Sequence, residues 1–136
     1  MRSADSPSRQ INAKAYAFEN VYDRVGTGKL LYPWAHIDCD DGYAMSAPVG
    51  KFKANGFGPH DMLGNALEWV TACYRATYKD APADGSAFVN SDCGKRVLRG
   101  DTWANWPSFN RAAHRDSDEP SDRALGYGLR VARALD

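Results

Sequence analysis

The chain of 136 residues has no excess of charge of either sign. Its 17 Lys and Arg residues balance 17 Asp and Glu residues, so the formal net charge at pH 7 is zero. Nucleic acids and anionic lipids attract proteins over long range through clustered positive charge, which a balanced chain lacks. We therefore expect neither nucleic acid nor a membrane among the partners of this protein.

Long hydrophobic runs are missing as well. The mean hydropathy is −0.56, and no stretch approaches the roughly 20 apolar residues that cross a bilayer. Residues 1–10, MRSADSPSRQ, contain no apolar segment, so they do not resemble a signal peptide. As written, the chain is expected to be cytoplasmic, or periplasmic or secreted if it is a fragment. Residues 1–12 are expected to form a flexible tail before one domain at residues 13–136.

Cysteine is scarce, and none of the three residues lies in a CxxC pair, which argues against a zinc knuckle. Cys73 and Cys93 lie 20 residues apart on either side of a polar loop that contains Gly and Pro. This spacing leaves two alternatives open. The two residues form a disulfide, which would stabilise the fold by about 3 kcal/mol, or they are reduced and packed thiols. Cys39 is the remaining thiol.

The common catalytic motifs are absent too. The chain contains no GxSxG, no HExxH and no glycine loop of the kind that binds phosphate. His36, His60 and His114 are scattered, without a partner that would indicate nucleophilic catalysis. We therefore assign no catalytic residue from the sequence.

Glycine, proline and aromatic residues are abundant instead. The chain has 12 Gly and seven Pro, with seven Tyr, five Phe and four Trp, which is typical of a turn-rich α+β fold with little regular secondary structure. A helix is predicted over residues 61–70, where Asp61 can cap it and apolar residues share one face. Strands are predicted over residues 47–52, 97–103 and 127–132. Among the other segments, 13–22 is a short helix or an extended arm, 26–28 a break, 78–95 a long loop and 105–123 irregular chain.

Two acidic turns offer oxygen atoms to a cation. Asp38, Asp40 and Asp41 lie close together in the first turn, and Asp61 and Glu68 flank the second. Calcium takes six to eight oxygen ligands of this kind, but neither turn has the spacing of an EF-hand loop. Spacing alone favours capping and turn formation over a calcium site.

The run NGFGPHDMLGNALEW at residues 55–69 resembles the NxFGLYDMxGNVWEW signature of the formylglycine-generating enzyme (sulfatase-modifying factor) family. Three other segments are similar to family motifs in the same order: DGY at 41–43 with APVG at 47–50, VLRGDTW at 97–103, and GLRVAR at 128–133. The resemblance covers residues 18–135 and corresponds to the C-terminal part of a family domain. Residues 13–136 are therefore expected to be a truncated domain of this family.

The resemblance implies a C-type-lectin-like fold with a small twisted antiparallel sheet and bound calcium. It places one calcium site at Asn20, Val21, Asp41 and Tyr43, and a second at Asp61, Gly64, Ala66 and Glu68. Carbonyl groups that bind a metal cannot all bond within a helix, so this expectation conflicts with a helix over residues 61–70. The resemblance also suggests that Cys73 and Cys93 form a structural pair.

The oxidase chemistry of the family is not expected to carry over. Formylglycine-generating enzymes oxidise a substrate cysteine with two active-site cysteines and copper. The segment in which those cysteines would lie, residues 104–115, contains none here. Copper(I) prefers soft thiolate ligands, so copper is not expected as a cofactor.

Four individual residues carry further expectations. Asp101 replaces a glycine of the family motif and is expected to disfavour the backbone conformation that glycine allows. Three arginines, Arg111, Arg115 and Arg130, are expected to form ion pairs with nearby acids. The expected partners are Asp116, Asp118 or Glu119.

Three functions are compatible with the sequence. The first is a binding or accessory module for a protein or peptide ligand, without oxidase activity. The second is an active oxidoreductase that needs a partner or a missing segment. The third is a ligand-binding variable protein of a diversity-generating retroelement, whose fold the family shares, although Trp106 and Phe109 are equally compatible with the core. Its ligand face would comprise Asn105, Trp106, Ser108, Phe109, Asn110, His114 and Asp116.

Overall fold

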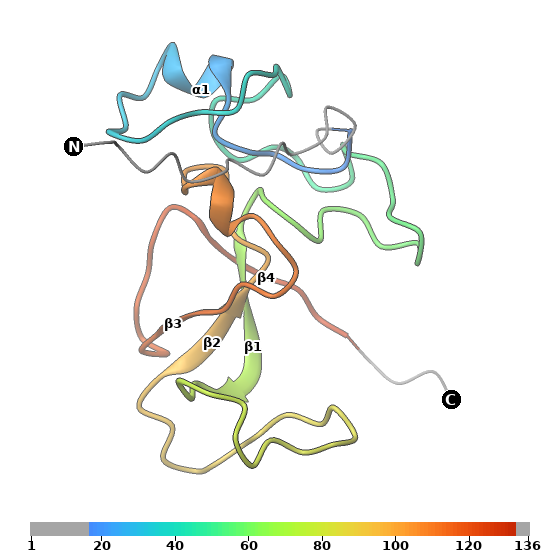
Figure 1. Ribbon diagram of the computed structural model, residues 1–136, viewed down its shortest axis with the longest axis vertical. Coiled ribbons are helices and arrows are strands. Elements are labelled where there is room, and N and C mark those ends of the chain that lie inside the picture. The colour runs from blue at the N-terminus through green and yellow to red at the C-terminus, as the bar shows by residue number, and fades with distance from the viewer. Residues whose placement is uncertain (1–16, 133–136) are drawn as a thin grey trace, which may run out of the picture.

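The computed structural model describes residues 17–132. Most of this chain is turn and irregular loop, which confirms the α+β class and the low content of regular structure. No helix in the described part is long and apolar enough to cross a membrane. The regular elements are α1 (Arg24–Thr27), β1 (Leu67–Cys73), β2 (Arg96–Arg99), the 3-10 helix η2 (Pro107–Phe109), β3 (Asp116–Asp118) and β4 (Tyr127–Leu129) (Figure 1).

The four strands form one sheet in the order β3-β2-β1-β4. β2 is antiparallel to both β1 and β3, but β4 is parallel to β1. The expected antiparallel sheet is therefore wrong in part, because the sheet is mixed. β3 and β4 run in the same direction at opposite edges of the sheet. Residues 119–126 therefore carry the chain from one edge of the sheet to the other.

The apolar core of the sheet is centred on β2. Leu98 is fully buried and Val97 nearly so, as expected for a strand with neighbours on both sides. Trp69 of β1 lies opposite Leu98 and packs edge-on against Tyr127 of β4, with ring centroids 5.6 Å apart. These contacts hold β1, β2 and β4 together.

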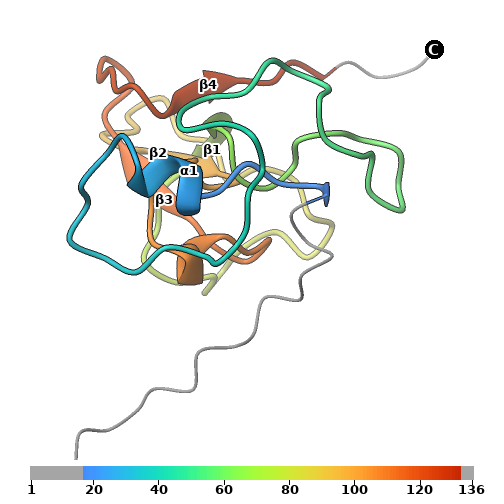
Figure 2. The same ribbon diagram turned by 90° about the horizontal axis from the view of Figure 1, so that it is seen from above.

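The chain before the sheet forms a region of loops around α1. We call residues 17–66 the loop region and residues 67–132 the sheet region. Figure 1 places α1 and its flanking loops above the sheet and the loop at residues 74–92 below it, and Figure 2 looks down on the α1 side. The small apolar cluster of the loop region consists of Val21, Ile37 and Cys39.

The helix predicted over residues 61–70 is wrong. Residues 61–66 are irregular, and residues 67–70 belong to β1. Asp61, Gly64 and Asn65 have φ angles of 53°, 69° and 62°, which a right-handed helix does not allow. Of the apolar residues that were expected to share one helical face, only Leu67 is buried, whereas Met62 is exposed and Leu63, Ala66 and Val70 are half-buried.

Other predicted elements are shifted or absent. Residues 47–52 form no strand, whereas the strands expected at 97–103 and 127–132 exist in shortened form as β2 and β4. The segment 105–123 is not wholly irregular, because it contains η2 and β3. Residues 18–22 form no helix, and residues 1–16, which include the expected tail, lie outside the described residues.

The expected break at residues 26–28 lies in and after α1. Asp23 caps this helix because its Oδ1 accepts hydrogen bonds from the backbone N–H groups of Val25 at 2.8 Å and Gly26 at 3.1 Å. A capping aspartate satisfies the free N–H groups of the first turn. The cap therefore outweighs the low helix propensity of Gly26.

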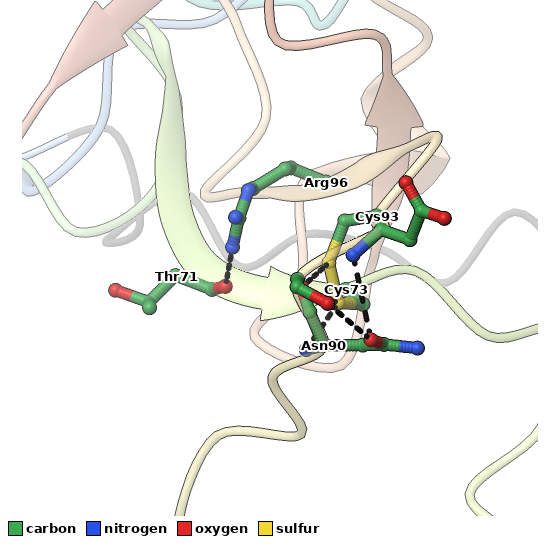
Figure 3. The surroundings of a disulfide bond; sticks show 7 residues. Thr71, Cys73, Asn90, Cys93 and Arg96 are labelled. Atoms are coloured by element: carbon green, nitrogen blue, oxygen red, sulfur yellow. Dashed lines mark hydrogen bonds between the residues drawn. A yellow bond between two sulfur atoms is a disulfide. The ribbon is translucent and has the colours of Figure 1, made fainter.

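A disulfide closes the loop that follows β1. Cys73, the last residue of β1, is bonded to Cys93, with their Cα atoms 5.4 Å apart. Figure 3 shows Asn90 beside this bridge, where its backbone N–H donates to Cys73 Sγ. The same view shows the Arg96 guanidinium donating to the Thr71 carbonyl across the β1–β2 pair. Of the two states that the cysteine spacing left open, the structure has the disulfide.

Candidate functional site

Buried amide side chains hold the loop region together. Asn20 is fully buried, and its Nδ2 donates to the Met45 carbonyl at 2.9 Å and to Asn65 Oδ1 at 3.1 Å. Asn65 in turn accepts a hydrogen bond from the Ala47 N–H and donates one to the Ala47 carbonyl. Gly64 lies so close to Asn20 that a Cβ atom there would collide with the Asn20 carbonyl oxygen. We call these residues the amide network.

The first set of expected calcium ligands lies together beside this network. Asp41 Oδ2 accepts from the Val21 N–H and Asp41 Oδ1 from the Tyr43 N–H, each at 2.8 Å. Burial raises the pKa of Asp41 to about 6, although both hydrogen bonds oppose the shift. Asn20 Oδ1 is buried without a hydrogen-bond partner in residues 17–132. Asn20 directly precedes Val21, whose N–H donates to Asp41, so an unsatisfied amide oxygen and a carboxylate belong to neighbouring parts of this turn. Oxygen atoms of these two kinds are ligands that calcium takes.

The second set of expected ligands is engaged differently. Asp61 Oδ2 accepts from the Gly50 N–H at 2.6 Å, while its Oδ1 is buried and lacks a partner among the described residues. The Glu68 carboxylate forms an ion pair with Arg130 at 2.7 Å, and Arg130 Nη2 also donates to the Asp61 carbonyl. The expected pairing of Arg130 with Asp116, Asp118 or Glu119 is therefore wrong. A guanidinium already neutralises the carboxylate that calcium would need.

No acidic or thiol cluster gathers elsewhere. In the part of the chain that the structure describes, no three His, Cys, Asp or Glu residues lie close enough together to hold a metal ion. The first set contains one carboxylate and the second contains two, so neither is a cluster of three such residues.

The three cysteines are not placed as a pair of free thiols. Cys73 and Cys93 are bonded to each other, and Cys39 is buried against Asp23 Oδ2 with its sulfur 3.8 Å away. Burial, reinforced by the charges of Asp23 and Asp41, raises the pKa of Cys39 to about 12. Cys39 is therefore held as a neutral thiol, and the three cysteines of this chain do not supply the pair of thiolates that copper(I) prefers.

Trp106 lies on the surface and not in the core. Half of its side chain is exposed, and its ring stacks on Trp34 with centroids 5.8 Å apart. Trp34 stacks in turn on Tyr32 at 4.6 Å. This ladder extends from the segment after β2 to the loop region, and half of Trp106 remains exposed at its end.

Phe109 and His114 form a second aromatic pair in the expected ligand face. Their rings are stacked with centroids 4.8 Å apart, and Phe109 is exposed. His114 Nδ1 and both amide atoms of Asn110 are buried without hydrogen-bond partners within residues 17–132. Ser108 and Asp116 are exposed. The three unsatisfied atoms are buried, so the part of this face that a ligand can reach consists of the exposed aromatic rings and the exposed Ser108 and Asp116.

Asp101 adopts the conformation that it was expected to disfavour. Its φ is 66°, which aspartate tolerates better than most residues. Asp101 Oδ1 accepts from the Thr102 N–H at 2.9 Å and from Asn105 Nδ2 at 2.8 Å, while burial raises the pKa of the carboxyl group. The side chain thus compensates for the missing glycine and fixes Asn105 of the expected ligand face.

A cavity of about 620 Å³ lies near the junction of the two regions. Its wall is largely apolar and includes Phe18, Met62 and Leu63, but it also contains Glu19. Glu19 is only 9% exposed, and burial raises its pKa to about 7. The sequence analysis missed Glu19, because a single glutamate in a segment without periodicity gives no signal of burial.

Comparisons with known proteins point to one family. Residues 7–135 match the sulfatase-modifying factor enzyme 1-like domain. The hercynine oxygenase of Mycobacterium tuberculosis is 33% identical over 123 residues, which cover 82% of this chain and 29% of that protein. The formylglycine-generating enzyme of Thermomonospora curvata is 30% identical over 135 residues, which cover 80% of this chain and 45% of that protein.

Two solved structures share the fold. PvdO from Pseudomonas aeruginosa superposes with a TM-score of 0.68 at 35% identity, covering 84% of this chain and 38% of PvdO. Treponema denticola variable protein 1 superposes with a TM-score of 0.52 at 25% identity, covering 63% of this chain and 31% of that protein. These neighbours confirm the expected C-type-lectin-like fold of formylglycine-generating enzymes.

The chain spans less than half the length of each of these relatives and solved structures. Within that length it retains the motifs, the fold and the order of segments on which the resemblance was based. Because the family match extends over residues 7–135, this protein belongs to the sulfatase-modifying factor enzyme 1-like (formylglycine-generating enzyme-like) family.

Proposed function

We propose that this domain is a calcium-stabilised binding module without cysteine oxidase activity of its own. The observation that carries the proposal is the surface formed by Trp106 and Phe109. Both aromatic side chains are exposed in the segment where an oxidase of this family would need copper-binding thiols. Exposed aromatic rings among small polar residues are typical of surfaces that bind protein or peptide ligands.

Calcium fits the first set of residues best. The Asn20 side-chain oxygen, the Asp41 carboxylate and the carbonyls of Val21 and Tyr43 would hold it. The unpartnered Asn20 Oδ1 and the raised pKa of Asp41 both support a cation at this place, because it would satisfy the first and favour ionisation of the second. Calcium would supply positive charge that joins the chain at residues 20–21 to the turn at residues 41–43. The second set, whose Glu68 is paired with Arg130, would bind calcium more weakly.

Peptide selection tests the binding function. A displayed library of random 12-residue peptides is selected on the wild-type domain in calcium. The selected peptides are then measured against a Trp106→Ser/Phe109→Ser variant by calorimetry. We expect at least a tenfold loss of affinity, because anchoring aromatic residues dominate such interfaces. Phe57→Ser, which removes an aromatic ring that is 95% exposed elsewhere, is the matched control. Equal loss in the control, or none in the double variant, would contradict the proposal.

Mass spectrometry tests the oxidase function separately. The domain is incubated with a peptide that carries a sulfatase cysteine motif, copper(I) and oxygen, and the peptide mass is expected to stay unchanged. Conversion of the cysteine to formylglycine by the isolated domain would overturn this half of the proposal.

Two other functions have specific support. The likeness to Treponema denticola variable protein 1 favours a ligand-binding protein of a diversity-generating retroelement. The expected ligand face, Asn105 to Asp116, would then vary among related copies.

The names hercynine oxygenase and formylglycine-generating enzyme favour an oxidoreductase. Since the chain spans less than half of those proteins, the missing chemistry would have to come from a partner or another segment. Oxidase activity that appears only when a candidate partner is added would favour this reading.

A further inference from the structure

A second cavity, of about 570 Å³, lies between the sheet and the loop closed by the disulfide. Its wall includes three half-buried arginines, Arg75, Arg99 and Arg115, together with the exposed Lys79. No Asp or Glu of the described chain lines it. Even partial removal of a charged side chain from water has a free-energy cost, which pairing with an opposite charge offsets. Four cations and no anion around one cavity therefore call for an explanation.

Neutral groups hold the three guanidinium groups in place. Arg115 lies over the Tyr78 ring at 4.0 Å and donates to the Arg75 carbonyl at 3.0 Å. Arg75 lies over the Phe88 ring at 4.5 Å. These contacts fix the position of each charge without neutralising it.

Arg99 is held in the same way. Its Nη1 donates to the carbonyls of Ala112 and His114, and its Nη2 donates to the Tyr78 hydroxyl at 3.2 Å. Each guanidinium has five N–H donors. Arg99 has donors to spare, and Arg115 uses a single one within residues 17–132. Arg75 uses none there.

Three acids that are near the lining residues in sequence are directed elsewhere. Asp118 accepts from the Tyr127 hydroxyl at 2.7 Å, Asp116 from the Ser117 N–H and Asp84 from the Ser86 N–H. None of the three lines the cavity. The expected pairing of Arg115 with Asp116, Asp118 or Glu119 is therefore wrong, and this is the reason why the positive charge in the cavity is uncompensated.

We propose that this cavity binds the phosphate group of a small organic phosphate monoester. A phosphate dianion at pH 7.5 offers three acceptor oxygens and nearly two negative charges, which match several guanidinium groups with free donors around one cavity. The volume exceeds that of inorganic phosphate and lies in the range of small-molecule sites. The aromatic rings of Tyr78 and Phe88 would pack against the organic group. The site is separate from the surface formed by Trp106 and Phe109, neither of which lines it, so it does not depend on the proposed function above.

Calorimetry with three phenyl compounds tests the proposal. Phenyl phosphate, benzoate and phenol are titrated into the wild-type protein at pH 7.5 and constant ionic strength. We expect phenyl phosphate to bind at least tenfold more tightly than benzoate, and phenol to show no binding. Stronger binding of benzoate would overturn the assignment to a phosphate dianion. Equal binding of all three compounds would show that the aromatic wall, and not the charge, determines affinity.

Variants separate the cavity from general surface charge. Arg75→Gln removes a guanidinium that makes no hydrogen bond among the described residues, so the fold should survive, and we expect at least a tenfold loss of phenyl phosphate affinity. Arg111→Gln removes an exposed arginine that does not line the cavity and should change affinity less than twofold. Arg115→Gln provides a second cavity variant, with its fold verified by circular dichroism. Unchanged affinity in both cavity variants, or an equal loss in Arg111→Gln, would overturn the proposal.

Discussion

The loop region and the sheet region are stabilised by different interactions. Buried side-chain amides and carboxylates hold the loop region, where Asn20, Asn65 and Asp23 make the long-range hydrogen bonds. Strand pairing, the buried Leu98 and the disulfide hold the sheet region. Hydrogen bonds depend strictly on geometry, whereas apolar packing tolerates changes that conserve volume. The loop region should therefore be the more sensitive of the two to small changes of shape.

The largest effect is expected where shape matters most, at Gly64. Gly64→Ala would force a Cβ atom against the Asn20 carbonyl and place alanine at a φ of 69°. We expect the free energy of unfolding in urea to fall by about 4 kcal/mol or more, since both strain and a broken amide network contribute. Gly85→Ala is the control, because its φ is 78° but nothing lies within 4 Å of the added atom. That variant should lose only about 1 kcal/mol. Equal losses would mean that the conformation, and not the close approach, requires glycine.

In the sheet region, truncation of Leu98 should have the next largest effect. Leu98 is fully buried in the folded chain, so Leu98→Ala is expected to cost about 3 kcal/mol through lost burial and the resulting cavity. Leu98→Met, which nearly conserves volume, should cost less than about 1.5 kcal/mol. Urea denaturation of the two variants measures both losses in the free energy of unfolding. A similar cost for both substitutions would contradict the view that the sheet region depends on burial more than on shape.

The disulfide should contribute a comparable but slightly smaller amount. Cys73→Ser/Cys93→Ser removes a bridge between residues 20 apart, and the chain-entropy model gives a loss of about 3 kcal/mol, which strained or incomplete packing reduces. Hydrogen exchange locates the change. Residues 74–92 should lose protection, while the amides of Val25 and Gly26 in α1 should keep theirs. Equal loss of protection in both regions would mean that they unfold as one unit.

Sequence reasoning predicted the sheet region better than the loop region. β2 and β4 contain apolar residues bounded by glycine or irregular chain, a local pattern that indicates a strand. The segment 61–66 has helical spacing of apolar residues, yet its positive φ angles follow from contacts with Gly50, Asn20 and Ala47. Such contacts come from distant parts of the chain and leave no local pattern, so the helix prediction failed there.

The candidate site shows the same division. The resemblance to a family grouped Asn20, Val21, Asp41 and Tyr43, and in the structure Asp41 accepts hydrogen bonds from the N–H groups of Val21 and Tyr43. Local reasoning could not decide whether Trp106 belonged to the core or the surface, because its partner Trp34 lies 72 residues earlier in the chain. It also failed for Arg115, whose charge lies over Tyr78 and not beside the neighbouring acids.

Calcium should act on the loop region more than on the sheet region. After treatment with EDTA, addition of calcium at 100 times its dissociation constant is expected to raise the free energy of unfolding by about 2.7 kcal/mol. Hydrogen exchange should show the gain in protection at residues 20–43. Asp41→Asn should abolish the response, and Asp84→Asn, which changes an exposed acid in the loop at 74–92, should preserve it. A response that survives Asp41→Asn would place calcium elsewhere.

The smallest effect concerns Arg130, which joins the two regions. Its guanidinium pairs with Glu68 of β1 and donates to the carbonyls of His60 and Asp61 in the loop region. Because both side chains are partly exposed, Arg130→Gln is expected to lower the free energy of unfolding by only about 1 kcal/mol in EDTA. Asp38→Asn, which breaks the more exposed pair with Arg24, should cost less than about 0.5 kcal/mol.

The Arg130→Gln substitution also frees the carboxylate of Glu68. Without the guanidinium, Glu68 becomes available to calcium together with the unpartnered Asp61 Oδ1, so an excess of calcium should restore more stability to Arg130→Gln than to Asp38→Asn. Urea denaturation in EDTA and in calcium measures both differences, and an equal response to calcium in the two variants would show that Arg130 does not occupy the second cation site.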